Sequence, residues 1–194
     1  MMNTKKNLID RLSQTNRGLA TDSETQGALE TLIAQLESEN PTKNPLESKD
    51  LMGDWRLIYT TSQGILGLDR IPLTDLGEVY QCLRGDRLYN VAETKGALSV
   101  LGVVAVGATY TVMSPVRVQV TFRRAILGLQ SVMKYRSVAE FVERLERRDR
   151  LWAVDFPIPE RETVGKGWLE VTYLDADLRI GRGNEGSIFV LVKD

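Results

Sequence analysis

The feature that most constrains the fold is a strict two-residue alternation of apolar and polar side chains in the middle of the chain. Val116, Val118, Val120 and Phe122 are apolar, and the residues between them are arginine, glutamine and threonine. Successive side chains of a strand point to opposite faces, so this pattern predicts a strand with one buried and one solvated face. Shorter patterns of the same kind recur from residue 54 onward, which indicates a mostly β domain.

Further strands are predicted wherever such patterns lie between turn residues. They cover residues 54–61, 75–83, 87–94, 98–113, 116–123, 151–156, 167–174 and 187–192. Seven or eight antiparallel strands at short spacing are typical of a barrel or a sandwich. A barrel of about eight strands has an interior just wide enough for side chains or one small ligand. Residues 98–106 are apolar on both faces, so one face can line a lumen and the other needs a covering helix.

The first part of the chain carries a helical period instead. Residues 1–40 contain a short helix ending near Gly18 and a second helix that starts at Ser23. The second helix has an apolar stripe of Leu29, Leu32, Ile33 and Leu36. Asn-Pro pairs then end the helical pattern. We expect residues 1–45 to form an N-terminal helical extension, which packs on the outside or the end of a β domain of residues 46–194.

The middle of the chain combines another helix pattern with an excess of positive charge. A helix is predicted near residues 138–148, with Ser137 as its capping residue. Its apolar stripe consists of Val138, Phe141, Val142 and Leu145. Residues 117–150 hold nine Lys or Arg against four Asp or Glu. This excess fits either contact with anionic lipid headgroups or ordinary solvated faces.

Several function classes are excluded by composition. The chain contains no histidine, which removes Ser–His and Cys–His catalysis and histidine metal sites. The single cysteine, Cys82, cannot form an intramolecular disulfide or a thiolate zinc cluster. We therefore expect no catalytic residue, no metal site and no cofactor. A net charge of −1 gives no global attraction for nucleic acid. We also expect no signal peptide and no transmembrane helix, because the longest apolar stretch, residues 98–106, is too short to span a bilayer.

Two motifs resemble known families. Gly53-Asp54-Trp55 opens the first predicted strand and is similar to the lipocalin signature, whose Trp closes one end of a β-barrel. Residues 167–183 (GWLEVTYLDADLRIGRG) and 186–193 (GSIFVLVK) resemble the end of the plastid lipid-associated protein (fibrillin) family, and residues 53–62 (GDWRLIYTTS) resemble its start. The resemblance covers residues 51–194.

This resemblance implies a mostly β fold with a lipocalin-like antiparallel β-barrel, N-terminal helices and one helix inserted between strands. The family occurs in plastids and cyanobacteria, and the chain looks like a cyanobacterial-type member. Its members associate with thylakoids and lipid globules (plastoglobules), bind carotenoids, prenylquinones or fatty acids, and support photoprotection. The resemblance therefore implies a peripheral location on the cytoplasmic side of the thylakoid membrane or on a lipid globule.

Three groups of residues are candidates for the site. The predicted inward rows of the barrel are Trp55, Leu57 and Tyr59; Val116, Val118, Val120 and Phe122; and Leu169, Val171 and Tyr173. Apolar residues of two predicted loops are candidates for a mouth or gate: Ile65, Leu66, Leu68, Leu127 and Leu129. Asp175, Asp177, Arg179 and Arg182 are expected to form a polar corner, either as a rigid turn of paired charges or as a ligand-headgroup contact. Either arginine could meet Trp55.

Two functions remain open at this point. The first is non-catalytic binding or sequestration of a small lipophilic molecule, with a membrane or lipid-globule surface as the partner and no nucleic acid. The second is a structural coat or scaffold protein on lipid surfaces, with a filled barrel and no bound ligand. An enzyme is the least favoured class, since no carboxylate, lysine, tyrosine or serine is placed convincingly for catalysis.

Overall fold

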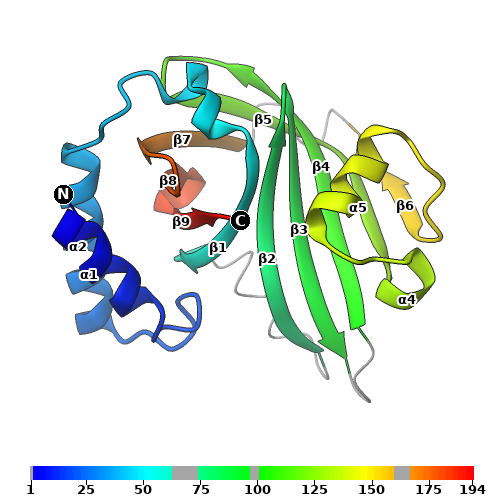
Figure 1. The fold of residues 1–194 in the computed structure, drawn as a ribbon, viewed down its shortest axis with the longest axis horizontal. Helices are drawn as coiled ribbons and strands as arrows, with labels where there is room; N and C mark the ends of the chain where they lie inside the picture. The colour runs from blue at the N-terminus through cyan, green and yellow to red at the C-terminus, as the bar shows by residue number, and fades with distance from the viewer. Residues whose placement is uncertain (1, 63–73, 97–100, 160–166) are drawn as a thin grey trace.

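Antiparallel strands close into a barrel in the computed structural model, which describes residues 2–62, 74–96, 101–159 and 167–194 (Figure 1). The barrel strands are β1 Gly53–Thr60, β2 Thr74–Arg84, β3 Arg87–Gly96, β4 Leu101–Val112, β5 Arg117–Leu129, β7 Gly167–Leu174, β8 Leu178–Gly183 and β9 Ile188–Lys193. Their order is β4-β3-β2-β1-β9-β8-β7-β5, and pairing between β4 and β5 closes the ring. The predicted lipocalin-like barrel with N-terminal helices and an inserted helix is confirmed.

The barrel has a long wall and a short wall. Strands β2 to β5 have 10 to 13 residues, whereas β8 and β9 have six each. On its edge away from β4, β5 pairs with two strands in turn. Its first part, Arg117–Val120, pairs with β7, and its later part, Arg124–Leu127, pairs with an extra strand, β6 (Val154–Pro157). The inner face of the long wall therefore extends past the short strands.

Two bulges decide which aromatic side chains face inward. The register of β1 against β9 shifts between Leu57 and Tyr59, and that of β7 against β8 shifts between Val171 and Tyr173. An extra residue in a strand reverses its alternation. Leu57 and Val171 therefore belong to the interior cluster, but Tyr59 and Tyr173 pack outside the barrel with the N-terminal helices. The prediction that both tyrosines face the lumen is wrong.

The N-terminal helices cover the outer face of the short wall (Figure 1). They are α1 (Met2–Leu12) and α2 (Ser23–Ser38). The shared cluster of buried residues is Leu8, Leu12, Leu29, Ile33, Leu36, Tyr59, Tyr173, Leu178, Ile180, Ile188 and Val190. The predicted packing of the α2 stripe on the barrel is thus confirmed. The cap of α2 is Asp22, which accepts a hydrogen bond from the backbone N of Thr25 at 2.7 Å, and α1 ends before Gly18.

A second helical layer covers the outer face of the long wall (Figure 1). Helix α5 (Val138–Glu146) begins at Ser137, whose hydroxyl accepts from the backbone N of Glu140. All four residues of its predicted stripe are buried, and they pack against Val103 and Ala105 of β4. The middle helix is therefore the covering helix that the sequence predicted for the second apolar face of this strand.

Two stretches outside the predicted strands and helices form regular secondary structure. Residues predicted as an apolar loop after Phe122 continue β5 to Leu129, followed by the short helix α4 (Gln130–Met133). The stretch between the predicted strands 167–174 and 187–192 contains a further strand, β8. The chain enters β1 through two short 3₁₀ helices, η1 (Pro45–Glu47) and η2 (Lys49–Leu51), and η5 (Asn184–Gly186) joins β8 to β9.

Candidate ligand-binding cavity

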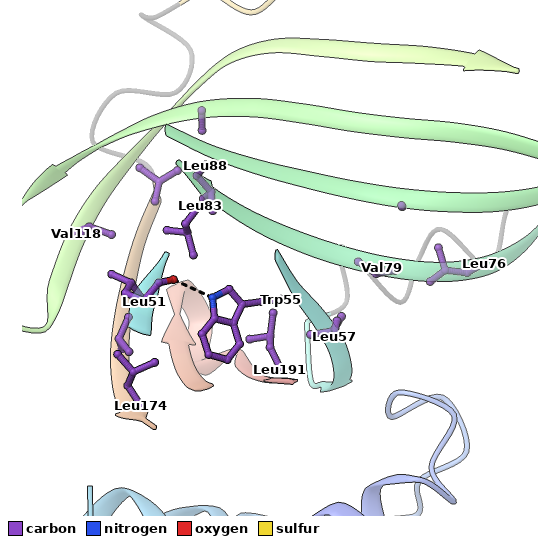
Figure 2. Packing of buried hydrophobic residues seen from close by; sticks show 14 residues of the cluster. Leu51, Trp55, Leu57, Leu76, Val79, Leu83, Leu88, Val118, Leu174 and Leu191 are labelled. Atoms are coloured by element: carbon purple, nitrogen blue, oxygen red, sulfur yellow. Dashed lines mark hydrogen bonds between the residues drawn. The ribbon is translucent and has the colours of Figure 1, made fainter. Parts of the chain in front are cut away.

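One end of the barrel is filled by side chains around Trp55. The indole is 0% exposed, and its Nε1 donates a hydrogen bond to the carbonyl oxygen of Leu51 at 2.8 Å (Figure 2). Leu83, Leu88, Val118 and Leu174 gather around the same end. Because the carbonyl of Leu51 belongs to η2, the segment before β1 is fixed across the barrel bottom. Buried side chains therefore fill this end of the barrel.

A cavity of about 430 Å³ lies further along the inner wall. Its lining comes from β1, β2, β3, β4, β5 and β9, and consists of Leu57, Val79, Tyr80, Gln81, Asn90, Val91, Ala92, Val104, Val106, Phe122, Phe189 and Leu191. The size is within the range of roughly 300–1,000 Å³ that is typical of small-molecule sites. Gln81 and Asn90 are the two amide side chains in an otherwise apolar or aromatic lining. The chemistry suits a mainly hydrocarbon ligand.

The structure divides the predicted lumen residues into three groups. Leu57 and Phe122 line the cavity. The packed interior contains Trp55, Val118, Val120, Val171 and, partly buried, Leu169. Tyr59 and Tyr173 lie outside the barrel, and Val116 is half-buried just before β5 begins. Five of the ten predicted lumen residues therefore fill the barrel, and two line the cavity.

Most of the cavity wall was missed at the sequence level. It comes from β2, β3, β4 and β9, whose inward residues include Val79, Ala92, Val104 and Leu191. The alternation in β3, where Asn90 lies between the inward Leu88 and Ala92, was the available signal. A polar residue in an inward row indicates a site, because core packing alone favours apolar residues there.

A buried arginine connects the filled end with the cavity. Arg179 of β8 is 1% exposed, and its guanidinium carbon lies 5.0 Å from the centre of the Trp55 ring. Its Nη2 donates a hydrogen bond to Oε1 of Gln81. Gln81 in turn donates from Nε2 to Oδ1 of Asn90 at 3.1 Å. Burial lowers the pKa of Arg179 to about 9, which leaves the guanidinium charged at neutral pH. Of the two candidate arginines, Arg179 is the one that meets Trp55.

The rim of the long wall carries exposed apolar side chains. Leu127 and Leu129 are 50% and 46% exposed, and Val154 and Phe156 of β6 are each 53% exposed. Leu127 pairs with Val154 across the strands, so their side chains share a face. Leu127 also pairs with the cavity residue Val104 on its other side, so this rim patch borders the cavity. The mouth candidates Ile65, Leu66 and Leu68 lie outside the described residues.

The family of this chain follows from its match to known proteins. The family model described as PAP_fibrillin matches residues 2–192. The chain belongs to this family. The match includes the N-terminal helices, and so extends beyond the residues 51–194 that the motifs covered. No solved structure gives a significant match to this PAP_fibrillin protein.

Curated relatives cover nearly the whole chain. The plastid lipid-associated protein 2 of Brassica campestris is 32% identical over 98% of this chain and 68% of its own length. The light-induced protein of Solanum demissum is 34% identical, with 98% and 67% covered. The chromoplast-specific carotenoid-associated protein of Cucumis sativus is 31% identical, with 98% and 67% covered. Within the described residues of this family member, no helix has both the length and the apolar character needed to cross a membrane.

The polar corner of the PAP_fibrillin chain is built differently from the prediction. Lys5 of α1 pairs with Asp175 at 2.8 Å and also with Asp177, while the hydroxyl of Tyr173 donates to Asp175 at 2.7 Å. Burial favours a higher pKa for Asp175, but the hydrogen bonds from Lys5 and Tyr173 outweigh it and hold that pKa well below its usual range. The corner therefore secures α1 to the barrel, and the aspartates do not pair with the arginines.

Arg182, the second arginine of the predicted corner, also lies apart from the two aspartates. Arg182 points to the outside of β8 and binds Glu37 of α2 through two hydrogen bonds of 2.8 and 2.7 Å. Arg179 and Arg182 thus lie on opposite sides of the same strand. Arg182 holds α2 against the barrel, whereas Arg179 extends into the barrel interior.

Proposed function

We propose that this protein binds and sequesters one small lipophilic molecule in its barrel without catalysing a reaction on it. The observation that carries the proposal is the 430 Å³ cavity, whose lining is almost wholly apolar. The names of the relatives, which include lipid-associated and carotenoid-associated proteins, support a ligand such as a carotenoid, a prenylquinone or a fatty acid. In a photosynthetic cell such sequestration would take place at a thylakoid or lipid-globule surface and support photoprotection.

The expected affinity follows from the buried area. A palmitate-sized ligand that buries ~450 Å² of apolar surface gains on the order of 11 kcal/mol at 25 cal/mol per Å². Lost translational freedom and side-chain ordering cost several kcal/mol, while contacts in a preformed cavity offset part of that cost. We therefore expect micromolar dissociation constants.

The binding proposal is tested by filling the cavity. Ala92 is 7% exposed and lines the cavity, so Ala92→Phe would place a ring in the space of the ligand. Ala139 is exposed on α5, and Ala139→Phe makes the same chemical change on the surface. We expect a decyl-substituted benzoquinone and palmitate to bind the wild type and Ala139→Phe with micromolar affinity, and to bind Ala92→Phe at least tenfold more weakly.

Binding can be followed through the intrinsic fluorescence of Trp55. Trp152 and Trp168 are replaced by Phe in all variants, so that the chain's three Trp are reduced to the one at the barrel bottom. Calorimetry gives a second, label-free measurement. If neither probe binds the wild type, and organic extracts of the protein from its native host contain no lipid, the carrier proposal is wrong.

The coat or scaffold function keeps support from the rim patch of Leu127, Leu129, Val154 and Phe156. Exposed neighbouring apolar side chains of this kind mark surfaces for lipid or protein. The electrostatic contribution is smaller than the +5 of residues 117–150 suggests, because Arg117 pairs with Glu170 and Arg124 with Asp155. Vesicle co-sedimentation separates the two contributions. Phe156→Ser should weaken binding at all salt concentrations, whereas added salt should remove only the part that depends on anionic lipid.

A further inference from the structure

The barrel wall is incomplete between β1 and β2. The two strands pair only over residues 53–56 of β1, and beyond that point β1 pairs with β9 alone among the described strands. Residues 74–79 of β2 likewise pair only with β3 within the described chain. Register shifts next to Leu57 and Leu76 bend the strands apart just past their last shared pair, because a bulge bends the strand that carries it. The facing edges, residues 57–60 and 74–79, form a notch in the wall.

One residue of the helical layer closes this notch. The end of β1 turns away from β2 toward α1 and α2 (Figure 1), and the turn between these helices, residues 16–18, lies against it. The backbone N of Thr60 donates a hydrogen bond to the carbonyl oxygen of Arg17 at 3.1 Å. Nη2 of Arg17 donates to the carbonyl oxygen of Leu76 at 2.9 Å. Arg17 therefore joins the two edges of the notch, which do not pair with each other.

The turn that carries Arg17 has a strained backbone. Asn16 and Arg17 have φ values of 45° and 59°, and Gly18 has a φ of 104°. Arginine rarely adopts this left-handed region, and strained residues of this kind cluster at clamps and switches. In addition, Nε of Arg17 is shielded from solvent and has no hydrogen-bond partner among the described residues. Release of the turn would relax the backbone and hydrate Nε, which offsets part of the cost of the two lost hydrogen bonds.

The notch separates two hollows. Leu57 lines both the 430 Å³ cavity inside the barrel and a second hollow of about 400 Å³ beneath α1. On the other edge, the neighbouring residues Val79 and Glu78 of β2 line the inner and the outer hollow, respectively. Arg17 and the apolar Leu12 of α1 belong to the outer hollow. The two spaces therefore lie on either side of the wall at the point that the turn closes.

We propose that the α1–α2 turn is a lateral gate of the barrel. When Arg17 releases Thr60 and Leu76, the notch opens, and a lipophile passes between the outer hollow and the cavity along Leu57. This inference rests on the proposed lipophile-binding function and concerns the route by which the ligand reaches its site. Arg17 is not part of the cavity lining, so the gate controls how fast a ligand enters and leaves and not how tightly it is held.

The experiment opens the gate by two independent substitutions. In Gly18→Ala, the added Cβ would collide with the carbonyl oxygen of Thr60 and displace the turn. Arg17→Met removes the hydrogen bond to Leu76 and keeps the apolar stem. The matched control is Gly27→Ala on α2, where an added Cβ meets no atom within 4 Å. Lys5→Met is a second control, since it loosens the helical layer at Asp175, away from the turn.

Stopped-flow fluorescence of Trp55 measures the rates, with the decyl-substituted benzoquinone as the probe and the other two Trp replaced by Phe. Loss of a hydrogen bond to a charged group should raise the open population, and with it both rate constants, roughly tenfold in Gly18→Ala and Arg17→Met. The dissociation constant should stay unchanged, because association and dissociation accelerate together. A residue that holds the bound ligand would instead alter mainly the dissociation rate. Both controls should keep the rates of the wild type.

Amide hydrogen exchange follows the gate without any ligand. The Thr60 amide is protected by Arg17, whereas the next amide, Thr61, donates to the carbonyl oxygen of Ile188 at 3.2 Å. Opening of the turn exposes the first amide and leaves the second bonded. We expect exchange at Thr60 to accelerate roughly tenfold in the two gate variants, in step with the binding rates. Exchange at Thr61 should not change.

The outcomes separate the gate from the binding function. A wild type that does not bind the quinone would refute lipophile binding, and the gate with it. Unchanged binding rates in both gate variants would overturn the gate and leave the carrier function standing, as would faster rates without faster exchange at Thr60. An equal acceleration in Lys5→Met would also overturn it, because general loosening of the helical layer would then set the rate. Should Gly18→Ala not fold, Arg17→Met decides, since it demands no new backbone conformation.

Discussion

Replacing Phe141 by alanine tests whether α5 is part of the core or a loose cover. Phe141 is 1% exposed and lies in the middle of the cluster that joins α5 to the outer face of the long wall. Its ring centre is 5.6 Å from that of Tyr135. A Phe→Ala change at a buried site removes the transfer free energy of the ring and leaves a cavity, at a cost of about 3–5 kcal/mol. This is a large part of the roughly 5–15 kcal/mol by which such domains are stable.

Urea unfolding measures this cost directly. The matched control is Glu143→Ala on the opposite face of α5, where the Glu143 side chain is 62% exposed and pairs with Arg147 at 3.3 Å. We expect the control to change the free energy of unfolding by no more than about 0.5 kcal/mol. The Phe141 variant should lower the urea midpoint without a change in slope. A loss as small as that of the control would show that α5 does not belong to the core.

Three other perturbations have defined outcomes. Folding lowers the pKa of Asp175, so the stability that its carboxylate contributes is complete above the unfolded pKa of about 4 and is lost as the pH falls further. Thermal unfolding between pH 7 and 2 should therefore show the unfolding temperatures of the wild type and Asp175→Asn converging in acid. Burial, with Asp54 nearby, raises the pKa of the Cys82 thiol, so a disulfide reagent should react only in step with urea unfolding, and fast labelling of the native protein would contradict its burial. A double-mutant cycle on Glu37→Gln and Arg182→Gln should give a coupling of about 1–2 kcal/mol, and a value near zero would mean that this pair does not secure α2.

The parts of the fold that the sequence predicts correctly are those where local chemistry and tertiary packing agree. Helix α5 is one example, since Ser137 caps it and its four apolar residues all become buried. The first half of β5 is another, because Val118 and Val120 alternate with polar residues and face the interior. In both cases one face is apolar over its whole length, and no other orientation would bury it.

The errors in the predicted fold arise at single residues, either an extra residue in a strand or a glycine within one, that alter how the neighbouring residues pack. No residue type marks the bulges after Leu57 and Val171, yet each bulge turns the following tyrosine from the interior to the helical layer. Gly181 and Gly183 of β8 lie between the predicted strands 167–174 and 187–192, where the sequence predicts no strand. An added Cβ would lie 3.1 Å from the carbonyl oxygen of Glu170 at Gly181 and 3.0 Å from the ring of Phe189 at Gly183. These glycines permit close packing within a strand, which the sequence alone does not distinguish from a turn.

The same reasoning explains why the candidate site was only partly found. Selecting strongly apolar inward rows selects residues such as Val118 and Val171, which are apolar because they fill the barrel. A cavity that recognises a head group needs polar side chains on an inward face, where filling a core would not place them. Gln81 and Asn90 have that property and line the cavity, yet neither was a candidate, and Arg179 was a candidate only as part of the polar corner. The distinction between a carrier and a filled scaffold therefore depends on the few polar residues inside the barrel, because apolar walls are common to both.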